Sequence, residues 1–208
     1  MQQFSEDTIE AVARVMADSF LDDPMNRAIL EGVDEKEALI LAHSRIHTQH
    51  AVRTGTLTLL DGNPGAFLIG LDSKDQSRLR DLNLIAKIYI KTFQMLSFRD
   101  IKRILQNNKK VGTVLSFSWQ KDLIKSRYYR VKIVAIDKSM RGKGAFRRLI
   151  APILEFSDTE NVPLILETHN AGNLGIYQKF GFELVKTINS PTTEIQQYCM
   201  IRWPVIAA

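Results

Sequence analysis

Apolar residues recur at helical spacing along the first 55 residues of the chain. Ser5 can cap a first helix, which Asp22-Asp23-Pro24 is expected to end. The apolar face of this helix consists of Ile9, Val12, Ala13, Met16 and Phe20. A second helix is predicted over residues 34–52, with Gly55 closing it. Residues 75–110 are also expected to be helical, because Leu82, Ile85, Ala86, Tyr89 and Phe93 follow the same period.

The other regular segments are expected to be mostly strands. Two of them, 56–60 and 66–71, flank a turn at 61–65, and a third covers the β-branched and aromatic residues 128–136. A helix is predicted from about Gly144, and Pro152 inside it should kink it or remove a hydrogen bond. A strand at 162–168, a short helix at 173–180 and strands at 182–188 and 195–203 complete the pattern. Without an obvious linker or repeat, residues 1–208 are expected to form one mixed α/β domain.

Composition narrows the class of protein. The chain is 45% apolar and 25% charged, which is the balance of a globular protein. The acidic start MQQFSEDTIE does not have the pattern of a secretory signal, and no apolar run reaches membrane-spanning length. Cys199 is the only cysteine, which excludes an intrachain disulfide and a CxxC metal site. We therefore expect a cytoplasmic protein with no membrane partner and no metal.

The charge is divided unevenly along the chain. Residues 74–148 hold 20 Lys or Arg against five Asp and no Glu, and the remaining residues hold eight bases against 18 acids. The basic part favours an anionic partner, which could be a nucleic acid or a phosphorylated cofactor. The acidic part could suit an amine-bearing partner. Solvated helix faces would explain the same charges without any ligand.

A strand, a glycine-containing turn and a helix follow one another over residues 131–156. Gly142 and Gly144 would let the backbone approach a ligand, and the helix N-terminus would offer free N–H groups to a pyrophosphate. The pattern excludes a Walker loop, because Lys143 is followed by glycine rather than Ser or Thr. A dinucleotide-binding GxGxxG is excluded because Arg147 stands at the position of its last glycine.

A second polar segment, LETHNAGNLGIYQKFGFELV, follows at residues 166–185. Here Glu167 ends a strand, Asn170 and Asn173 precede a short helix, and Tyr177 lies on that helix. A phenol with a pKa of about 10 could protonate a departing thiolate, and a carboxylate could take a proton from an amine. The arrangement is plausible for acyl transfer.

The segments VAIDKSMRGKGAFRRLI and ETHNAGNLGIYQKFGF resemble the two central motifs of the GNAT superfamily of acetyl-CoA-dependent N-acyltransferases. Arg141 and Gly144 fit the family's [RQ]xxGx[GA] loop, with Phe146 where a small residue is usual. Asn170, Tyr177, Gly181 and Phe182 fit its N-x(6)-Y-x(3)-GF pattern. The similarity covers residues 129–188. The Asp-Asp-Pro and the long helical stretch more distantly resemble the branch that includes puromycin acetyltransferase.

The resemblance implies an α/β (α+β) fold with a splayed, mostly antiparallel central sheet and helices on both faces. Residues 128–188 would form the cofactor-binding core, with helical acceptor-side elements at 5–53 and 75–110. Tyr177 would be the general acid and Glu167 the base, or the anchor of a water that acts as base. The residues implied to bind acetyl-CoA are Val134, Ala135, Ile136, Arg141, Gly142, Lys143, Gly144, Ala145, Phe146, Arg147, Asn170 and Asn173.

We therefore expect direct acetyl transfer from acetyl-CoA to a primary amine of a small molecule or peptide, without an acyl-enzyme. Tyr89 and Phe93 are expected to wall the acceptor pocket, with N-terminal acids favouring cationic amines. His169 could also reach the acceptor, whereas metal binding is not expected at His43, His47 and His50, because the HExxH pattern is absent. A non-catalytic acyl-CoA-binding domain and a nucleic-acid-binding module remain alternatives, and a homodimer is left open.

Overall fold

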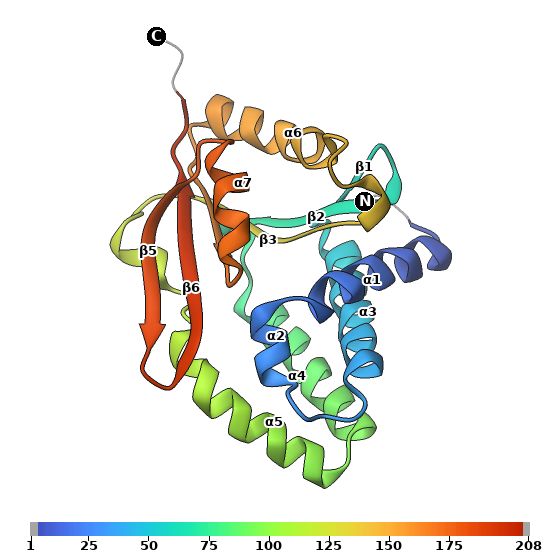
Figure 1. Ribbon diagram of the computed structural model, residues 1–208. Coiled ribbons are helices and arrows are strands. Elements are labelled where there is room, and N and C mark those ends of the chain that lie inside the picture. Colours follow the sequence, from blue (N-terminus) through green and yellow to red (C-terminus); the bar gives the residue numbers. More distant parts are fainter. Residues whose placement is uncertain (1–3, 206–208) are drawn as a thin grey trace.

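Six strands form one open sheet in the computed structural model, which describes residues 4–205 (Figure 1). The spatial order is β1-β2-β3-β4-β6-β5, and every neighbouring pair is antiparallel except β3 and β4. This confirms the predicted mostly antiparallel sheet. The strands are β1 (Leu57–Leu60), β2 (Asn63–Asp72), β3 (Tyr129–Ile136), β4 (Leu164–Thr168), β5 (Glu183–Ser190) and β6 (Thr193–Arg202).

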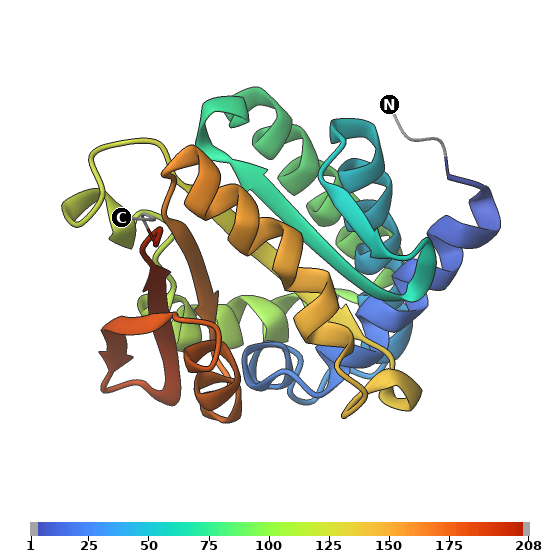
Figure 2. The same cartoon turned by 90° about the horizontal axis from the view of Figure 1, so that it is seen from above.

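Helices cover both faces of this sheet, as predicted. The helices are α1 (Glu6–Leu21), α2 (Pro24–Ile29), α3 (Lys36–Thr54), α4 (Arg78–Met95), α5 (Phe98–Val111), α6 (Ala145–Glu160) and α7 (Leu174–Gln178). Viewed from above, α6 lies across β2 and β3 (Figure 2), while α1 and α3 lie on the opposite face. Alternating residues of β2 join the two layers: Ala66 and Leu68 contact the α6 layer, and Phe67 and Ile69 contact the α1–α3 layer.

Several predicted boundaries are confirmed by their capping geometry. The hydroxyl of Ser5 accepts a hydrogen bond from the backbone N–H of Thr8 at the start of α1. Gly55 ends α3 in the left-handed conformation, with a φ of 67°. Pro152 lies inside α6. The turn predicted over 61–65 is shorter, because Asp61 and Gly62 both take positive φ and form a tight hairpin turn, so that β2 begins at Asn63.

Two helical segments differ from the prediction. Asp22-Asp23-Pro24 does end α1, but Asp23 then caps a further short helix, α2, by accepting from the backbone N–H groups of Met25 and Asn26. The stretch 75–110 is divided into α4 and α5, because Ser97 starts a new helix by accepting from the N–H of Asp100. No residue of α4 is fully buried.

The two parallel strands separate after a short paired stretch. Only Tyr129, Arg130 and Val131 of β3 pair with β4, although β3 continues to Ile136. On its other side β3 pairs with β2 as far as Ile136, with an irregularity opposite Ile69 and Gly70. Among the described residues, the β4-facing backbone of residues 132–136 therefore has no strand partner. This splayed half of β3 leads directly into the glycine turn.

Candidate functional site

The glycine turn forms an exposed loop between β3 and α6. Asp137 caps a short 3-10 turn, Lys138–Met140, by accepting from the N–H of Ser139, and the Nε of Arg141 donates to the carbonyl of Ile136. Gly142 and Gly144 each have a φ of 74°, a left-handed conformation that disfavours other residues. Gly144 is the N-cap of α6, so the first N–H groups of this helix face the loop.

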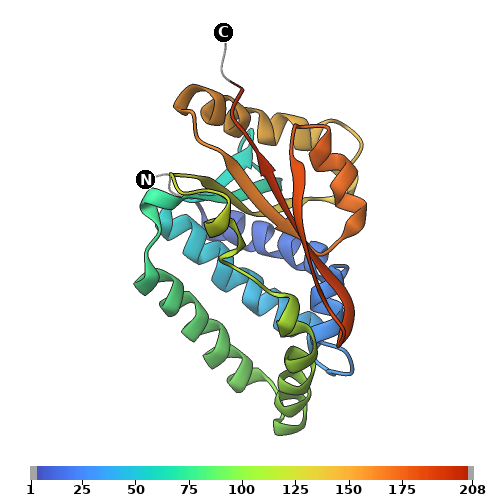
Figure 3. The same cartoon turned by 90° about the vertical axis from the view of Figure 1, so that its left-hand side faces the viewer.

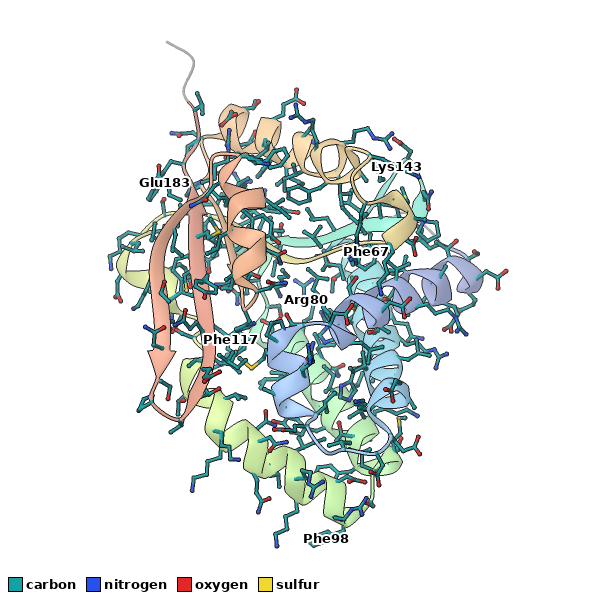
Figure 4. All side chains as sticks on the ribbon, viewed as in Figure 1. Phe67, Arg80, Phe98, Phe117, Lys143 and Glu183 are labelled. Carbon is teal, nitrogen blue, oxygen red and sulfur yellow. The ribbon has the colours of Figure 1, made fainter. Side chains whose placement is uncertain are left out.

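Nothing fills the space above the two glycines. Apart from the adjacent residues, a Cβ built on either Gly142 or Gly144 would meet no atom of residues 4–205 within 4 Å. Arg141, Lys143 and Arg147 are exposed around the same loop, and Figure 4 shows Lys143 at its outer edge. The loop thus combines open backbone, a helix N-terminus and cationic side chains, which is the chemistry of a polyphosphate cradle.

The residues predicted to bind the donor on β3 lie beside this loop. Val134 and Ile136 are partly buried against the α6 layer, whereas Ala135 is buried in the α1–α3 layer. Their side chains therefore alternate between the two faces, and the unpaired backbone groups lie in the plane of the sheet. A ligand strand could add there by backbone hydrogen bonds.

Tyr177 lies on α7, and its ring faces the start of α6. The ring contacts Phe146 at a centroid distance of 5.7 Å and Phe182 at 6.0 Å. Burial among these apolar rings raises the pKa of Tyr177 to about 12. The hydroxyl consequently keeps its proton throughout the neutral range. The same group of rings explains why Phe146 replaces a small residue here: its side chain packs inward, leaving the exposed face of the loop free.

The two asparagines have structural roles in the loop after β4. The side-chain oxygen of Asn170 accepts from the N–H of Gly172 at 2.9 Å, and the amide of Asn173 donates to the Thr168 hydroxyl at 3.3 Å. Both hydrogen bonds fix the short turn that leads into α7. Asn170 itself is exposed.

Glu167 is not a free carboxylate. Its Oε1 accepts from the indole Nε1 of Trp119 at 2.6 Å and from the guanidinium of Arg130. The Glu167 and Arg130 side chains are only 17% and 12% exposed, so their ion pair is screened little by water. Sequence reasoning missed both partners, because Trp119 belongs to the segment between α5 and β3 for which we predicted no element. Arg130 was expected only as part of a strand at 128–136, with no pairing partner predicted for that strand.

His169 directly follows β4, and the alternation of side chains along the strand places it on the same face of the sheet as Glu167 and Ile165. Its Nε2 is buried and has no hydrogen-bond partner among residues 4–205. Burial lowers the pKa of His169 below its usual value, and the field of Asp23 opposes this shift. The imidazole is therefore neutral at neutral pH, with an unpaired nitrogen.

Acids of the α1–α2 turn lie near the end of β3 as well. A cavity of about 270 Å³ has Asp18, Asp22, Asp137, Ile136 and Arg141 among its lining residues. Since Asp23 also acts on His169, this acidic turn extends from the end of β3 towards the end of β4. A larger hollow of about 730 Å³, between α5, Gly32 and Thr192, contains none of the cradle residues.

Metal binding by the histidines of α3 and insertion into a membrane were not expected from the sequence. Within residues 4–205 no group of three or more His, Cys, Asp or Glu could hold a metal, and no helix has the length and hydropathy needed to cross a membrane. His43 donates to or accepts from the Thr92 hydroxyl at 2.9 Å, which fixes α4 against α3.

The prediction that Tyr89 and Phe93 wall an acceptor pocket is wrong, because both lie on the exposed side of α4.

Comparison with known proteins agrees with this geometry. The profile of the acetyltransferase (GNAT) family matches residues 84–182. An uncharacterized N-acetyltransferase of Schizosaccharomyces pombe is 37% identical over 71 residues, which is 32% of this chain and only 28% of that protein's length.

Two solved structures have a similar fold. A protein from Corynebacterium glutamicum described as histone acetyltransferase HPA2 and related acetyltransferase is 15% identical, with a TM-score of 0.59 over 100% of this chain and 97% of that chain. The arylalkylamine N-acetyltransferase 2 of Aedes aegypti is 14% identical, also with a TM-score of 0.59, over 97% of each chain.

Proposed function

This chain belongs to the GNAT superfamily of acetyltransferases, and on that premise we propose that it is an N-acetyltransferase that moves an acetyl group directly from acetyl-CoA to an amine. One observation carries the proposal. The unpaired half of β3 leads without interruption into a cationic glycine loop at a helix N-terminus. The first feature suits the amides of a pantetheine arm and the second suits a pyrophosphate, in the order in which CoA carries them.

The residues present fit this donor. The open space above Gly142 and Gly144 would admit a pyrophosphate against the N–H groups at the start of α6. Arg141, Lys143 and Arg147 would neutralise its charge, and Ala145 and Phe146 would support the loop from inside. The backbone of Val134, Ala135 and Ile136 would pair with the pantetheine arm. Acetyl-CoA, when bound, supplies the activated acetyl group as a thioester.

Tyr177 is the proposed acid. Attack by the amine nitrogen on the thioester carbonyl breaks the C–S bond, and the phenol would give its proton to the departing sulfur. A pKa of about 12 for Tyr177 does not prevent this, because burial makes a thiolate more basic too: burial raises the pKa of the Cys199 thiol to about 11 in this protein. In a desolvated site the phenol and the thiol are therefore closer in acidity than they are in water.

The base is proposed to be His169, with Glu167 in a positioning role. The amine must lose a proton, and the buried Nε2 of His169, which has no hydrogen-bond partner among residues 4–205, would accept it in the tautomer that is protonated at Nδ1. Glu167 is engaged by Arg130 and Trp119, so that direct proton abstraction would disrupt a low-exposure ion pair. Glu167 is therefore proposed to anchor a water molecule or the neighbouring strand end, and it is not the proposed direct base.

A cationic amine is the proposed acceptor. Asp22 and Asp18 line the cavity at the end of β3 together with Lys138 and Arg141, and Asp22 lies 3.7 Å from the Nζ of Lys138. The next residue, Asp23, acts on His169. An acceptor with a second ammonium group would pair with these carboxylates while its reacting amine approaches His169. The comparisons name an arylalkylamine acetyltransferase among proteins of this fold, which supports an amine acceptor in general.

A turnover screen tests the acceptor class. Thiol release from acetyl-CoA would be followed over diamines, arylalkylamines and N-terminal peptides, with wild type and Asp22→Asn/Asp23→Asn. We expect diamines to be the best acceptors and the double variant to raise their Michaelis constant selectively. Arylalkylamines serve as the matched neutral-tail control. Equal activity with cationic and neutral-tailed amines would overturn the assignment, and CoA binding without turnover of any amine would favour the non-catalytic alternative.

A further inference from the structure

The side of α4 that faces away from α3 is apolar from Leu79 to Phe93. Thr92 contacts His43 of α3 and Asp81 lies 3.8 Å from Lys132 of β3, which identifies the inner side of the helix. The other side carries large apolar side chains that are each between 48% and 80% exposed. We call these the outer stripe: Leu79, Leu82, Ile85, Tyr89, Ile90 and Phe93. Figure 3 shows α4 at the edge of the molecule, with no other element outside it.

The outer stripe is larger than an ordinary exposed patch. At 100° per residue its members fall within an arc of roughly 140°, over a helix about 27 Å long. Their exposed surface is on the order of 700 Å², above the ~300–600 Å² of the largest patch on a typical monomer. A stable interface buries roughly 800 Å² per partner. The stripe alone thus provides most of what one partner of a stable complex contributes.

We propose that α4 pairs with α4 of a second copy of this chain, antiparallel about a two-fold axis near Ala86. Ala86 is exposed close to the middle of the stripe, where its small side chain lets two helices approach to about 8–10 Å. In an antiparallel pair Leu79 of one copy faces Phe93 of the other, so large residues meet at both ends and small ones at the centre.

The charges on α4 favour a second copy over a lipid surface. The stripe is bordered on one edge by the neutral amides of Asn83 and Gln94, which suit the rim of an interface. One basic residue, the exposed Arg78, lies within the arc of the stripe at the N-terminal end of α4. The other basic residues, Arg80, Lys87 and Lys91, lie roughly 130–170° from the centre of the stripe, calculated from the helical period. These three bases would therefore point away from a membrane against which the stripe rests, whereas interfacial helices place several bases near the lipid headgroups. In the pair they do not approach one another.

Light scattering after gel filtration tests the proposal on the whole chain. Wild type is expected at twice the chain mass of 23.7 kDa, and Leu82→Glu/Phe93→Glu at the single-chain mass. Phe117→Glu is the matched control, since Phe117 is 76% exposed but lies outside the stripe, and it should remain dimeric. Circular dichroism and melting temperature verify that each variant is folded, which is expected because all three positions are exposed.

Cross-linking tests the geometry. Ala86→Cys should form an intermolecular disulfide under mild oxidation, whereas Arg80→Cys, on the basic side, should not. The natural Cys199 is fully buried and does not compete. A monomeric wild type at all concentrations, a dimer that survives Leu82→Glu/Phe93→Glu, or cross-linking at Arg80→Cys in place of Ala86→Cys would each overturn the proposal. So would sedimentation of wild type with phosphatidylserine vesicles that the double variant abolishes.

Discussion

The rings of Phe146 and Tyr177 meet edge to face, with centroids 5.7 Å apart and an interplanar angle of 68°. Phe146 is the second residue of α6, directly after the glycine loop, and Tyr177 lies on α7. The contact thus joins the loop proposed to hold the pyrophosphate to the phenol proposed to protonate the leaving sulfur. Phe146 also meets Phe180, two residues beyond the end of α7, at 5.0 Å, so α7 and the turn that follows it are held against α6 by two aromatic contacts.

Phe146→Leu should therefore disturb catalysis more than donor binding. Leucine keeps an apolar side chain but removes the edge-to-face contacts, which should lower the free energy of unfolding by about 0.5–1.5 kcal/mol. We expect a lower kcat with a nearly unchanged dissociation constant for acetyl-CoA. Phe156→Leu is the control, because Phe156 lies on the same helix as Phe146 and makes a similar aromatic contact, with Tyr129 of β3. An equal fall in kcat for both variants would mean that Phe146 has no special link to Tyr177.

Neutralising the loop should weaken donor binding. Arg141→Gln/Lys143→Gln should reduce the affinity for CoA by about 1–3 kcal/mol, the range of charge-assisted hydrogen bonds. Calorimetry measures this, with Lys109→Gln/Lys110→Gln on α5 as a control of equal charge change. Affinity that is the same in all three proteins would remove Arg141 and Lys143 from the site.

The pH dependence of kcat/KM distinguishes the two candidate bases. His169 must be neutral to accept a proton, so activity should fall as the pH drops through its lowered pKa, at a pH below about 6.5. His169→Gln should lower turnover and remove this acidic limb. Glu167→Gln should lower turnover but keep the limb, because it breaks the ion pair with Arg130 without removing the imidazole. A limb that disappears in Glu167→Gln and persists in His169→Gln would reverse the two roles.

Stability should decrease in mild acid because of two histidines on α3. Burial lowers the pKa of His43 and of His47 to about 4, so the unfolded chain binds more protons than the folded chain between about pH 4 and pH 6.5. Their contribution is present above that window and is lost as the pH falls through it, by at most about 3 kcal/mol for each histidine.

Urea unfolding between pH 7.5 and pH 5 measures this loss. Above pH 5 the carboxylates with lowered pKa values, such as Asp72 and Asp158, stay ionised and add little slope. His47→Gln should have a flatter stability profile than wild type. His50→Gln is the comparison, because the pKa of His50 is lowered less by burial. A wild-type profile that is already flat over this range would contradict the lowered pKa values of the half-buried His43 and His47.

Features set by local chemistry could be predicted from the sequence. The effects of Ser5, Gly55 and the two loop glycines are confined to one turn of the chain. Ser5 caps α1 as predicted, and the three glycines all take the left-handed conformation that glycine allows. The mostly antiparallel sheet was expected only through the resemblance of two short motifs, since pairing between distant strands leaves little trace in local pattern.

The features that could not be predicted depend on distant contacts. Trp119 begins a short 3-10 turn, Trp119–Asp122, and is buried because it packs against β4 and β6 and donates a hydrogen bond to Glu167. The periodic apolar residues of α4 predicted a face in contact with the protein, yet Tyr89 and Phe93 lie on the exposed side. Periodicity predicts that a face is apolar, but it does not say what covers that face.

Acetyl transfer itself is tested most directly in a single turnover with excess enzyme. Wild type mixed with acetyl-CoA and a diamine should release CoA thiol and form N-acetylated amine in equal amounts. Tyr177→Phe should slow this step by roughly 10²-fold, as expected when a positioned acid is removed, with the melting temperature and acetyl-CoA affinity nearly unchanged. Single-turnover rates exclude slow product release as the cause. Thiol release without acetylated amine, or a Tyr177→Phe rate equal to wild type, would contradict the account.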